Sequence, residues 1–234
     1  MKEIRIASFA ELHRALREYQ RSNLWLFRGQ GEPEWKLVPK AGRGPFAVYD
    51  DSAMFEAWER RSAEFLTSGP LDVWDALAVA QHHGLATRLL DWSFNPLVAA
   101  FFAAWEKFET DAVVFAYYSS RYVEPREGSP FDFEGVRRFK PRGVAQRITR
   151  QSGIFTVHGP AEVDLEQALR PEDTLEKIII DRGYRSQLLF DLSFYGVNRL
   201  TLFPDLDGLA AHMNWATANR EFWAGRSVEE LEEA

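Results

Sequence analysis

The stretch that most constrains the fold covers residues 81–104 and reads QHHGLATRLLDWSFNPLVAAFFAA. Its second half is apolar on every side, and a helix of that kind must be buried. Asn95 suits the N-cap of this helix, and Pro96 suits its first position, where the missing N–H costs nothing. The polar residues before the helix are therefore expected near the middle of the protein, where a rigid scaffold positions functional groups.

A second helix is expected just upstream, capped by Asp72 and ended by Gly84 in the left-handed conformation that terminates helices. Only residues 85–93 separate the two helices, so this segment must be extended or tightly turned. The polar side chains in and beside it are thereby held close together. They are His83, Thr87, Arg88, Asp91 and Ser93.

Composition places the chain among globular proteins. It has 234 residues, of which 46% are hydrophobic and 14% aromatic, enough for a substantial core. The absence of cysteine removes disulfides, cysteine-ligated metals and thiol nucleophiles. No apolar run reaches membrane length and residues 1–9 lack a signal-like region, so we expect a cytoplasmic protein without a membrane partner.

The formal net charge of −7 disfavours a general nucleic-acid binder. The charge is uneven, with an acidic C-terminal tail at 225–234 and a basic segment between 137 and 150. The basic residues are Arg137, Arg138, Lys140, Arg142, Arg147 and Arg150. This segment is either a solvated loop or a surface that meets a phosphate-bearing partner.

Periodicity and turn signals predict the other elements. The expected helices cover 9–19, 51–67 (with Phe55, Trp58, Phe65 and Leu66 inward), 184–195 and a segment from 205 past 215, and the expected strands cover 24–27, 112–118, 154–158 and 175–180. Residues 31–44 should form a surface loop, and 124–135 a long acidic excursion. No linker divides the chain, and strands and helices do not alternate regularly. We therefore expect one α+β domain with a mixed or antiparallel central sheet and flanking helices.

Arg28 ends a predicted strand and precedes Gly29. An arginine there can bind phosphate or carboxylate through two N–H groups, and the glycine lets a ligand approach the backbone. Alternatively, Arg28 pairs with Asp91 or another core carboxylate. Arg88 and Asp91, three residues apart, suit an internal ion pair that fixes a loop. Gln151, at a strand entrance, can bind a sugar hydroxyl or cap a turn.

The familiar nucleotide, metal and hydrolase motifs are missing: G-x-G-x-x-G, Walker A, H-E-x-x-H and G-x-S-x-G. His82 and His83 are adjacent, so on a helix they point about 100° apart and do not easily share a metal. His83 either stabilises the end of the helix before Gly84 or takes part in chemistry. No metal site is expected.

Four motifs together resemble the FRG domain, a family named for its Phe/Tyr-Arg-Gly motif. They are FRGQ (27–30), QHHGLATRLLDWSFNPLVAAFFA (81–103), RQSGIFTVH (150–158) and LFPDLDGLA (202–210). The resemblance implies one FRG domain across 1–234, with core motifs over about 24–210. It also implies a bacterial or phage-associated protein in a setting of toxins or phage defence, with an antitoxin or immunity protein as partner.

The motif order is also similar to the plan of ADP-ribosyltransferases. That plan has an Arg or His on a first core strand, a Ser/Thr-containing strand leading into a helix with A-x-x-F-A, and a Glu or Gln at the start of a later strand. The resemblance implies that Arg28 matches the first motif, residues 87–93 with 99–103 the second, and Gln151 the third. The chain departs from the plan, since TRLLDWS replaces S-T-S and Arg-Gln at 150–151 replaces E-x-E.

This resemblance implies cleavage of the nicotinamide–ribose bond of NAD, without a metal, through an oxocarbenium-like ribose. ADP-ribose would pass to an acceptor that the sequence does not name: protein, nucleic acid, small molecule or water. The expected catalytic residues are Arg28, His83 and Gln151. The expected cofactor-binding residues are Arg28, Gly29, His83, Thr87, Arg88, Asp91, Ser93 and Tyr117.

Within this scheme Arg28 would hold phosphate, and His83 and Thr87 would bind ribose or the nicotinamide amide. Tyr117 would stack on a ring, and Gln151 or Asp91 would bind the ribose hydroxyl nearest the reacting carbon. Two other classes use the same residues. One is a non-catalytic ligand- or partner-binding module, and the other is a metal-independent nuclease that pairs His83 with His158.

Overall fold

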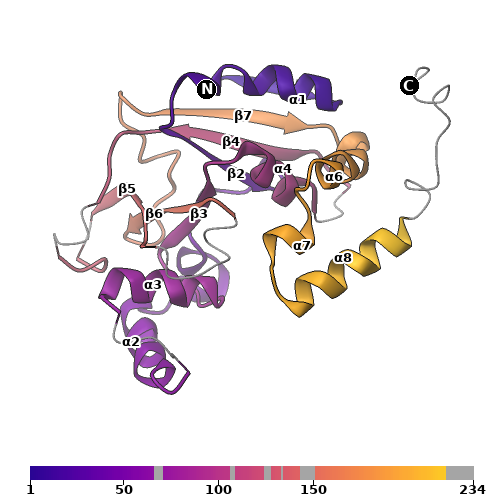
Figure 1. Cartoon of the computed structure of the whole chain (residues 1–234). Helices are drawn as coiled ribbons and strands as arrows, with labels where there is room; N and C mark the ends of the chain where they lie inside the picture. Colours follow the sequence, from indigo (N-terminus) through magenta and orange to yellow (C-terminus); the bar gives the residue numbers. More distant parts are fainter. Residues whose placement is uncertain (66–70, 106–108, 124–127, 133, 143–150, 220–234) are drawn as a thin grey trace, which may run out of the picture.

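The centre of the molecule is a mixed β-sheet (Figure 1). The computed structural model describes residues 1–65, 71–105, 109–123, 128–132, 134–142 and 151–219. Within these ranges the sheet has seven strands in the order β1-β7-β4-β2-β3-β6-β5, and only the β1–β7 pair is parallel. The strands are β1 Glu3–Ile6, β2 Trp25–Gln30, β3 Leu89–Ser93, β4 Ala112–Tyr118, β5 Gly135–Phe139, β6 Gly153–Gly159 and β7 Thr174–Ile180. The expected α+β unit is confirmed.

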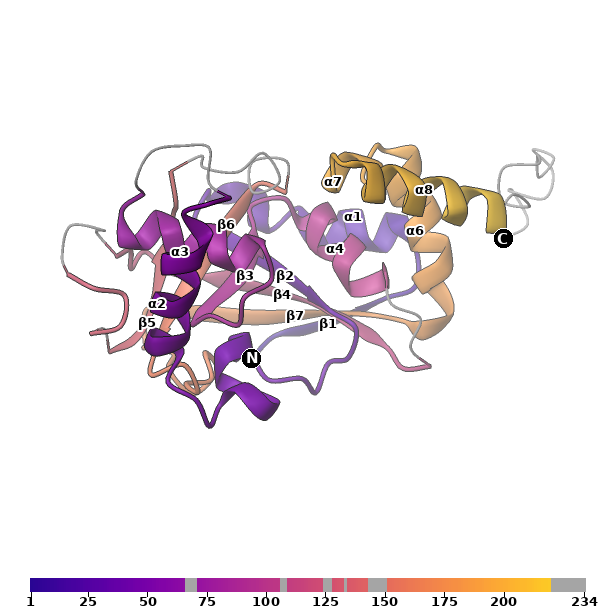
Figure 2. The same ribbon diagram turned by 90° about the horizontal axis from the view of Figure 1, so that it is seen from below.

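Helices cover one face of this sheet. They are α1 Phe9–Leu16, α2 Asp51–Ser62, α3 Val73–His82, α4 Pro96–Trp105, α6 Arg185–Phe194, α7 Arg199–Leu202 and α8 Leu206–Ala218. Successive strand residues point to opposite faces. Phe27 and Val114 share a core with α1, α4 and α6, whereas Leu89 and Phe155 share a core with α2 and α3. Figure 2 shows α2 and α3 at one end of the sheet and α4 and α6 at the other.

Loops cover the opposite face. Leu26 and Phe115 point to this face and belong to a further core, where Leu37 and Leu165 from two loops pack against the sheet. The backbone N–H of Leu165 donates to the carbonyl of Leu37 at 3.1 Å, which joins the two loops. The expectation that 31–44 forms a surface loop is therefore wrong for its middle, because Leu37 is needed to bury the apolar strand residues beneath it.

The apolar helix α4 is buried, as expected. Ala100 and Ala103 are fully buried, and the helix lies between β2 and α6. The side chain of Asn95 accepts a hydrogen bond from the N–H of Leu97 at 2.9 Å and so caps the helix. Gly84, with φ of +88°, directly follows the C-cap residue His83 and terminates α3. The signals that flank the two helices were therefore interpreted correctly.

The first part of the basic segment is a strand and not a solvated loop, whereas Lys140 and Arg142, which follow the strand, are exposed in a loop. Residues 135–139 form β5, and the side chain of Arg138 is fully buried. Arg138 donates to the carbonyls of Leu24 and Ser119. The sequence suggested a loop because charged residues are depleted in strands, but pairing with β6 decides the conformation. Arg147 and Arg150 lie outside the described residues.

Helix α2 is shorter than expected. It ends at Ser62, and Phe65, expected to point inward, is 75% exposed. Phe55 is buried, as expected. Leu66 lies outside the described residues, as do parts of the expected acidic excursion and the whole tail 225–234. Among the helices of the described ranges, none has the length and apolarity that a membrane crossing requires.

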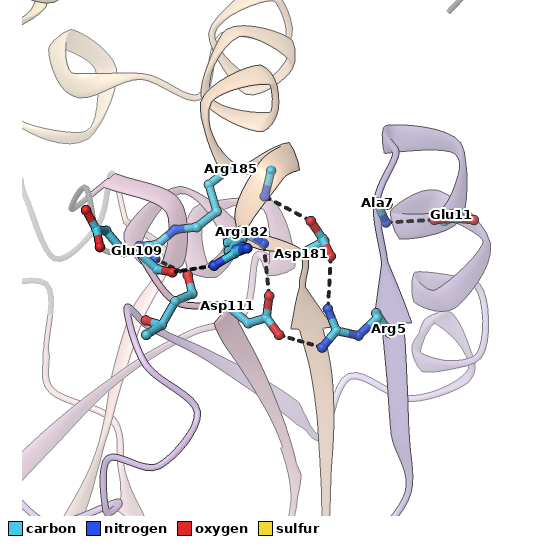
Figure 3. Close-up of polar contacts among 10 residues, drawn as sticks. Arg5, Ala7, Glu11, Glu109, Asp111, Asp181, Arg182 and Arg185 are labelled. Carbon is cyan, nitrogen blue, oxygen red and sulfur yellow. Dashed lines mark hydrogen bonds and ion pairs between the residues drawn. The ribbon is translucent and has the colours of Figure 1, made fainter.

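A charged network ties the edge of the sheet to α6 (Figure 3). Arg5 on β1 contacts Asp111 and Asp181, and the backbone N–H of Arg182 donates to Asp111 at 3.0 Å. Beside it, the buried Arg185 donates to three backbone carbonyls of residues that the structure describes. These are Ala103 at the end of α4 (2.9 Å), Thr110 before β4 (2.9 Å) and Gly31 after β2 (3.2 Å). Arg185 thereby fixes the end of β2.

Candidate functional site

A cavity of about 710 Å³ lies where β2 and β3 separate. The two strands share a single residue pair, Phe27 with Ser93, so the strands part beyond it. The walls come from β2, the loop after it, the end of α3, β3, α4 and the start of β6. The polar lining residues are Arg28, Gln30, Arg43, Gln81, His82, His83, Asp91, Ser93 and Gln151. The volume is typical of sites for small molecules and cofactors.

Arg28 fills the opening between the two strands. Its Nη1 donates to the backbone carbonyl of Asp91 at 2.8 Å and lies 3.9 Å from Oδ2 of the same residue. Its Nε is buried without a hydrogen-bond partner among the described residues. Burial lowers the pKa of Arg28 to about 10, so the guanidinium stays charged at neutral pH. Arg28 therefore contacts Asp91, which is one of its two expected roles, and it also lines the cavity.

The electrostatic balance of the cavity is positive. Arg43 is the second guanidinium in its wall, and burial lowers the pKa of Arg43 while the charge of Asp91 raises it. The neighbouring charge of Arg43 also contributes to the lowered pKa of Arg28. Among the described lining residues, Asp91 is the only carboxylate. Two arginines against one aspartate favour an anionic ligand.

Asp91 belongs to a hydrogen-bond chain that starts in the core. The hydroxyl of Thr87 donates to Oε1 of Gln81 at 2.6 Å, and Nε2 of Gln81 donates to Oδ2 of Asp91 at 2.9 Å. Thr87 is 1% exposed and does not line the cavity. Thr87 was expected to bind the ligand, but its hydroxyl is used inside the protein.

His83 stands at the end of α3. Its backbone N–H donates to the carbonyl of Val79 at 3.0 Å, and its ring lies 4.9 Å from the ring of His82. The side chain is exposed and lines the cavity. The backbone of His83 therefore completes α3, while its side chain remains accessible to a ligand.

Ser93 and Gln151 line the cavity and also brace it. The hydroxyl of Ser93 donates to the carbonyl of Gln151 at 2.7 Å and accepts from the N–H of Asn95 at 2.9 Å. Nε2 of Gln151 donates to the carbonyl of Leu202 in α7 at 3.2 Å. These bonds join the entrance of β6 to β3 and to α7.

Arg88 lies away from the cavity. Its Nε and Nη2 donate to the carboxylate of Asp51 at 2.8 and 2.6 Å, and its guanidinium stacks on Phe131. The expected ion pair between Arg88 and Asp91 is therefore wrong. Arg88 lies in a bend just before β3, where its side chain turns to Asp51 at the start of α2 and so does not pair with Asp91.

Tyr117 also lies away from the cavity. It is 1% exposed on the loop-covered face, where it packs on Trp92 with ring centroids 5.5 Å apart. Burial raises the pKa of Tyr117. Ala116, the preceding residue, faces the helices instead. One position along the strand thus decides that Tyr117 does not reach the site.

His158 is fully buried on β6 and does not line the cavity. Its Nδ1 lies 2.7 Å from the carbonyl of Val163, so Nδ1 carries the proton and Nε2 accepts from the hydroxyl of Thr156 at 2.9 Å. Burial lowers the pKa of His158 to about 4. In the part of the chain that the structure describes, no group of three or more His, Cys, Asp or Glu side chains is placed to hold a metal.

Sequence reasoning missed four of the polar lining residues: Gln30, Arg43, Gln81 and His82. Gln30 and Gln81 lie within motifs already quoted, and their position beside Arg28 and His83 was the available signal. Arg43 follows a loop whose path depends on long-range packing, so nothing local pointed to it.

Comparison with known families supports one assignment. The model of the FRG domain family matches residues 23–112, which run from just before β2 to the first residue of β4. No curated protein and no solved structure matches the chain significantly. The matched range includes Arg28, Gln81 and Asp91, whereas the quoted motifs at 150–158 and 202–210 lie outside it. Residues 23–112 of this chain therefore belong to the FRG domain family.

Proposed function

We propose that the cavity binds NAD and that the chain cleaves its nicotinamide–ribose bond in the manner of an ADP-ribosyltransferase. The observation that carries the proposal is the convergence of Arg28, Asp91 and Gln151 on one cavity. They come from β2, β3 and the entrance of β6, which are neighbours in that order. Strand β3 leads into α4, where residues 99–103 read A-x-x-F-A. This order agrees with the transferase plan.

The charges of the cavity support a dinucleotide ligand. Arg28 and Arg43 offer guanidinium N–H groups suited to a diphosphate, which carries the opposite charge. The side chains of Val98 and Phe102 provide an apolar wall for a ring. In this proposal His83, which is exposed at the end of α3 and lines the cavity, binds a ribose hydroxyl or the carboxamide.

In the proposed reaction, the bond between ribose C1′ and the nicotinamide nitrogen breaks, and its electron pair leaves with neutral nicotinamide. A bond then forms between C1′ and a nucleophile of the acceptor, which loses its proton to solvent; with water the products are ADP-ribose and a proton. The protein's task is to grip the diphosphate, orient the ribose and stabilise positive charge.

Within this proposal the chain acts in the cytoplasm as a toxin or phage-defence effector, and an antitoxin or immunity protein is its natural partner. The acceptor is a protein, a nucleic acid, a small molecule or water. The nuclease alternative has less support, because His158, its second histidine, is fully buried and does not line the cavity.

Calorimetric titration with NAD tests the proposal against a module that binds another partner. We expect a dissociation constant between about 1 μM and 1 mM. Arg28→Ala should weaken binding by about tenfold to a hundredfold, because a charge-assisted contact is lost. Arg60→Ala, an exposed change on α2, is the matched control and should bind like the wild type. Absence of heat with NAD, or unchanged affinity in Arg28→Ala, contradicts the proposal.

A further inference from the structure

We propose that Asp91 is the carboxylate that supports bond cleavage, and that Gln81 and Thr87 are positioning residues that hold it. This inference rests on the proposed function. The transferase plan places an acidic residue at the start of a later strand, where this chain has Gln151. Asp91 is the only carboxylate among the described residues of the cavity wall. Asp91, on β3, therefore replaces the acidic residue that the transferase plan has at the start of the later strand.

The hydrogen bonds fix the direction of the chain that holds Asp91. The hydroxyl of Thr87 accepts from the N–H of Leu89 at 3.2 Å and donates to Oε1 of Gln81 at 2.6 Å. Because Oε1 accepts this bond, Nε2 of Gln81 is the group that donates to Asp91, at 2.9 Å. A buried threonine thus orients the amide, and the amide orients the carboxylate.

Asp91 keeps the capacity to contact a ligand. Its side chain is 60% exposed, although its backbone carbonyl holds Arg28. The guanidinium of Arg28 stays 3.9 Å from Oδ2 and does not form a two-pronged pair with the carboxylate. Among the contacts of the described residues, both side-chain interactions of Asp91 involve Oδ2. Oδ1 is therefore available to a substrate.

This placement suits the charge that develops during cleavage. The carboxylate of Asp91 accepts a hydrogen bond from the ribose hydroxyl next to C1′, and its negative charge stabilises the oxocarbenium-like ribose. No proton moves to Asp91, since the electron pair of the broken bond leaves with nicotinamide. Gln151 has a different role, because its amide is engaged by the carbonyl of Leu202.

The first test compares Asp91→Asn with the wild type in nicotinamide release from NAD, and measures NAD affinity by calorimetry. Asn keeps the size and removes the charge. We expect kcat to fall by about 10²–10³, while KM and the dissociation constant change by less than about threefold, because a contact that strengthens in the transition state affects kcat. Asp207→Asn, an exposed change on α8, should match the wild type.

The second test separates positioning from structural support. Thr87→Val keeps the shape but removes the hydroxyl, and Thr87→Ser keeps the hydroxyl. We expect kcat to fall by about tenfold in Thr87→Val and in Gln81→Met, with NAD affinity unchanged, and to recover in Thr87→Ser. Equal kcat in Thr87→Val and Thr87→Ser overturns the positioning role.

The outcomes separate this inference from the function on which it rests. If the wild type cleaves NAD and Asp91→Asn retains its kcat, the assignment of Asp91 fails and the proposed function stands. If Asp91→Asn loses NAD affinity by more than about tenfold, Asp91 binds the ground state and the assignment also fails. If the wild type releases no nicotinamide, both fail.

Discussion

Single side chains explain why the sheet opens at the candidate site. Strands β2 and β3 pair at Phe27 and Ser93. Beyond this pair, the side chain of Arg28 links the two strands by donating to the carbonyl of Asp91. The guanidinium of Arg28 supplies a donor to this strand carbonyl while keeping its charge beside the cavity. The same arginine therefore stabilises the opening and gives it a positive potential.

His158 predicts how stability depends on pH. Its pKa is about 4 in the folded protein and 6.5 when unperturbed, so between these values the unfolded chain binds a proton that the folded chain does not. The free energy of unfolding should therefore be highest above pH 6.5. It should fall by up to about 3 kcal/mol as the pH drops toward 4. Urea unfolding at pH 7 and pH 5 measures this change.

His158→Gln is the control for this prediction, because glutamine does not titrate. The variant should be less stable at pH 7, since it disrupts the bonds to Thr156 and Val163. Its stability should change less between pH 7 and pH 5 than that of the wild type. An equal loss in both proteins assigns the acid sensitivity to other groups.

At the scale of elements, the contact between β2 and α4 sets one wall of the cavity. A Cβ atom on Gly29 would lie 1.9 Å from the carbonyl oxygen of Ala99 and 2.5 Å from the nitrogen of Ala103. Both atoms belong to the backbone of α4, so neither can turn aside. The glycine of the FRG motif is therefore required by close packing of a strand on a helix.

Gly29→Ala should lower the free energy of unfolding by about 3 kcal/mol or more, because the strand and the helix must separate. Urea denaturation measures this loss. Gly84→Ala is the comparison, since a Cβ there meets nothing within 4 Å and only the positive φ is strained; it should cost about 1 kcal/mol. A cost for Gly29→Ala no larger than that of Gly84→Ala contradicts the packing argument.

The elements that sequence predicted well carry strong local signals. Strand β4 was expected with its exact bounds, and α4 with its cap, because apolar continuity and Asn95-Pro96 are local features. Strands β1 and β5 were missed. Each contains two charged residues, in the sequences EIRI and GVRRF, and pairing with β7 and β6 makes them strands.

The residues of the candidate site were likewise predicted well where the sequence signal is local and poorly where it is not. Motifs near helix and strand ends led to Arg28, His83 and Asp91, which the fold brings to one cavity. Thr87 and Tyr117 were expected in the site but do not line the cavity. In an extended chain, a shift of one residue reverses the side to which a side chain points. Beside a polar site, the hydrophobic pattern alone does not determine which residues of the segment face the cavity.

At the scale of the whole molecule, the cavity lies where two groups of helices meet on one face of the sheet. Its walls include α4 from one group and the end of α3 from the other, with β2 and β3 as its floor. The floor is held from behind by the loop-covered core and at the end of β2 by Arg185. The site therefore depends on the entire fold rather than on one motif.

Release of nicotinamide from NAD by the purified full chain measures whether this cavity cleaves NAD, as we propose, with Arg28 in its wall. We expect release by the wild type and by Arg60→Ala, and a rate lower by at least about tenfold in Arg28→Ala, because the charged contact is lost. Circular dichroism should show that all three proteins are folded. If the folded wild type releases no nicotinamide, or if Arg28→Ala releases it at an equal rate, the cavity does not have the proposed function.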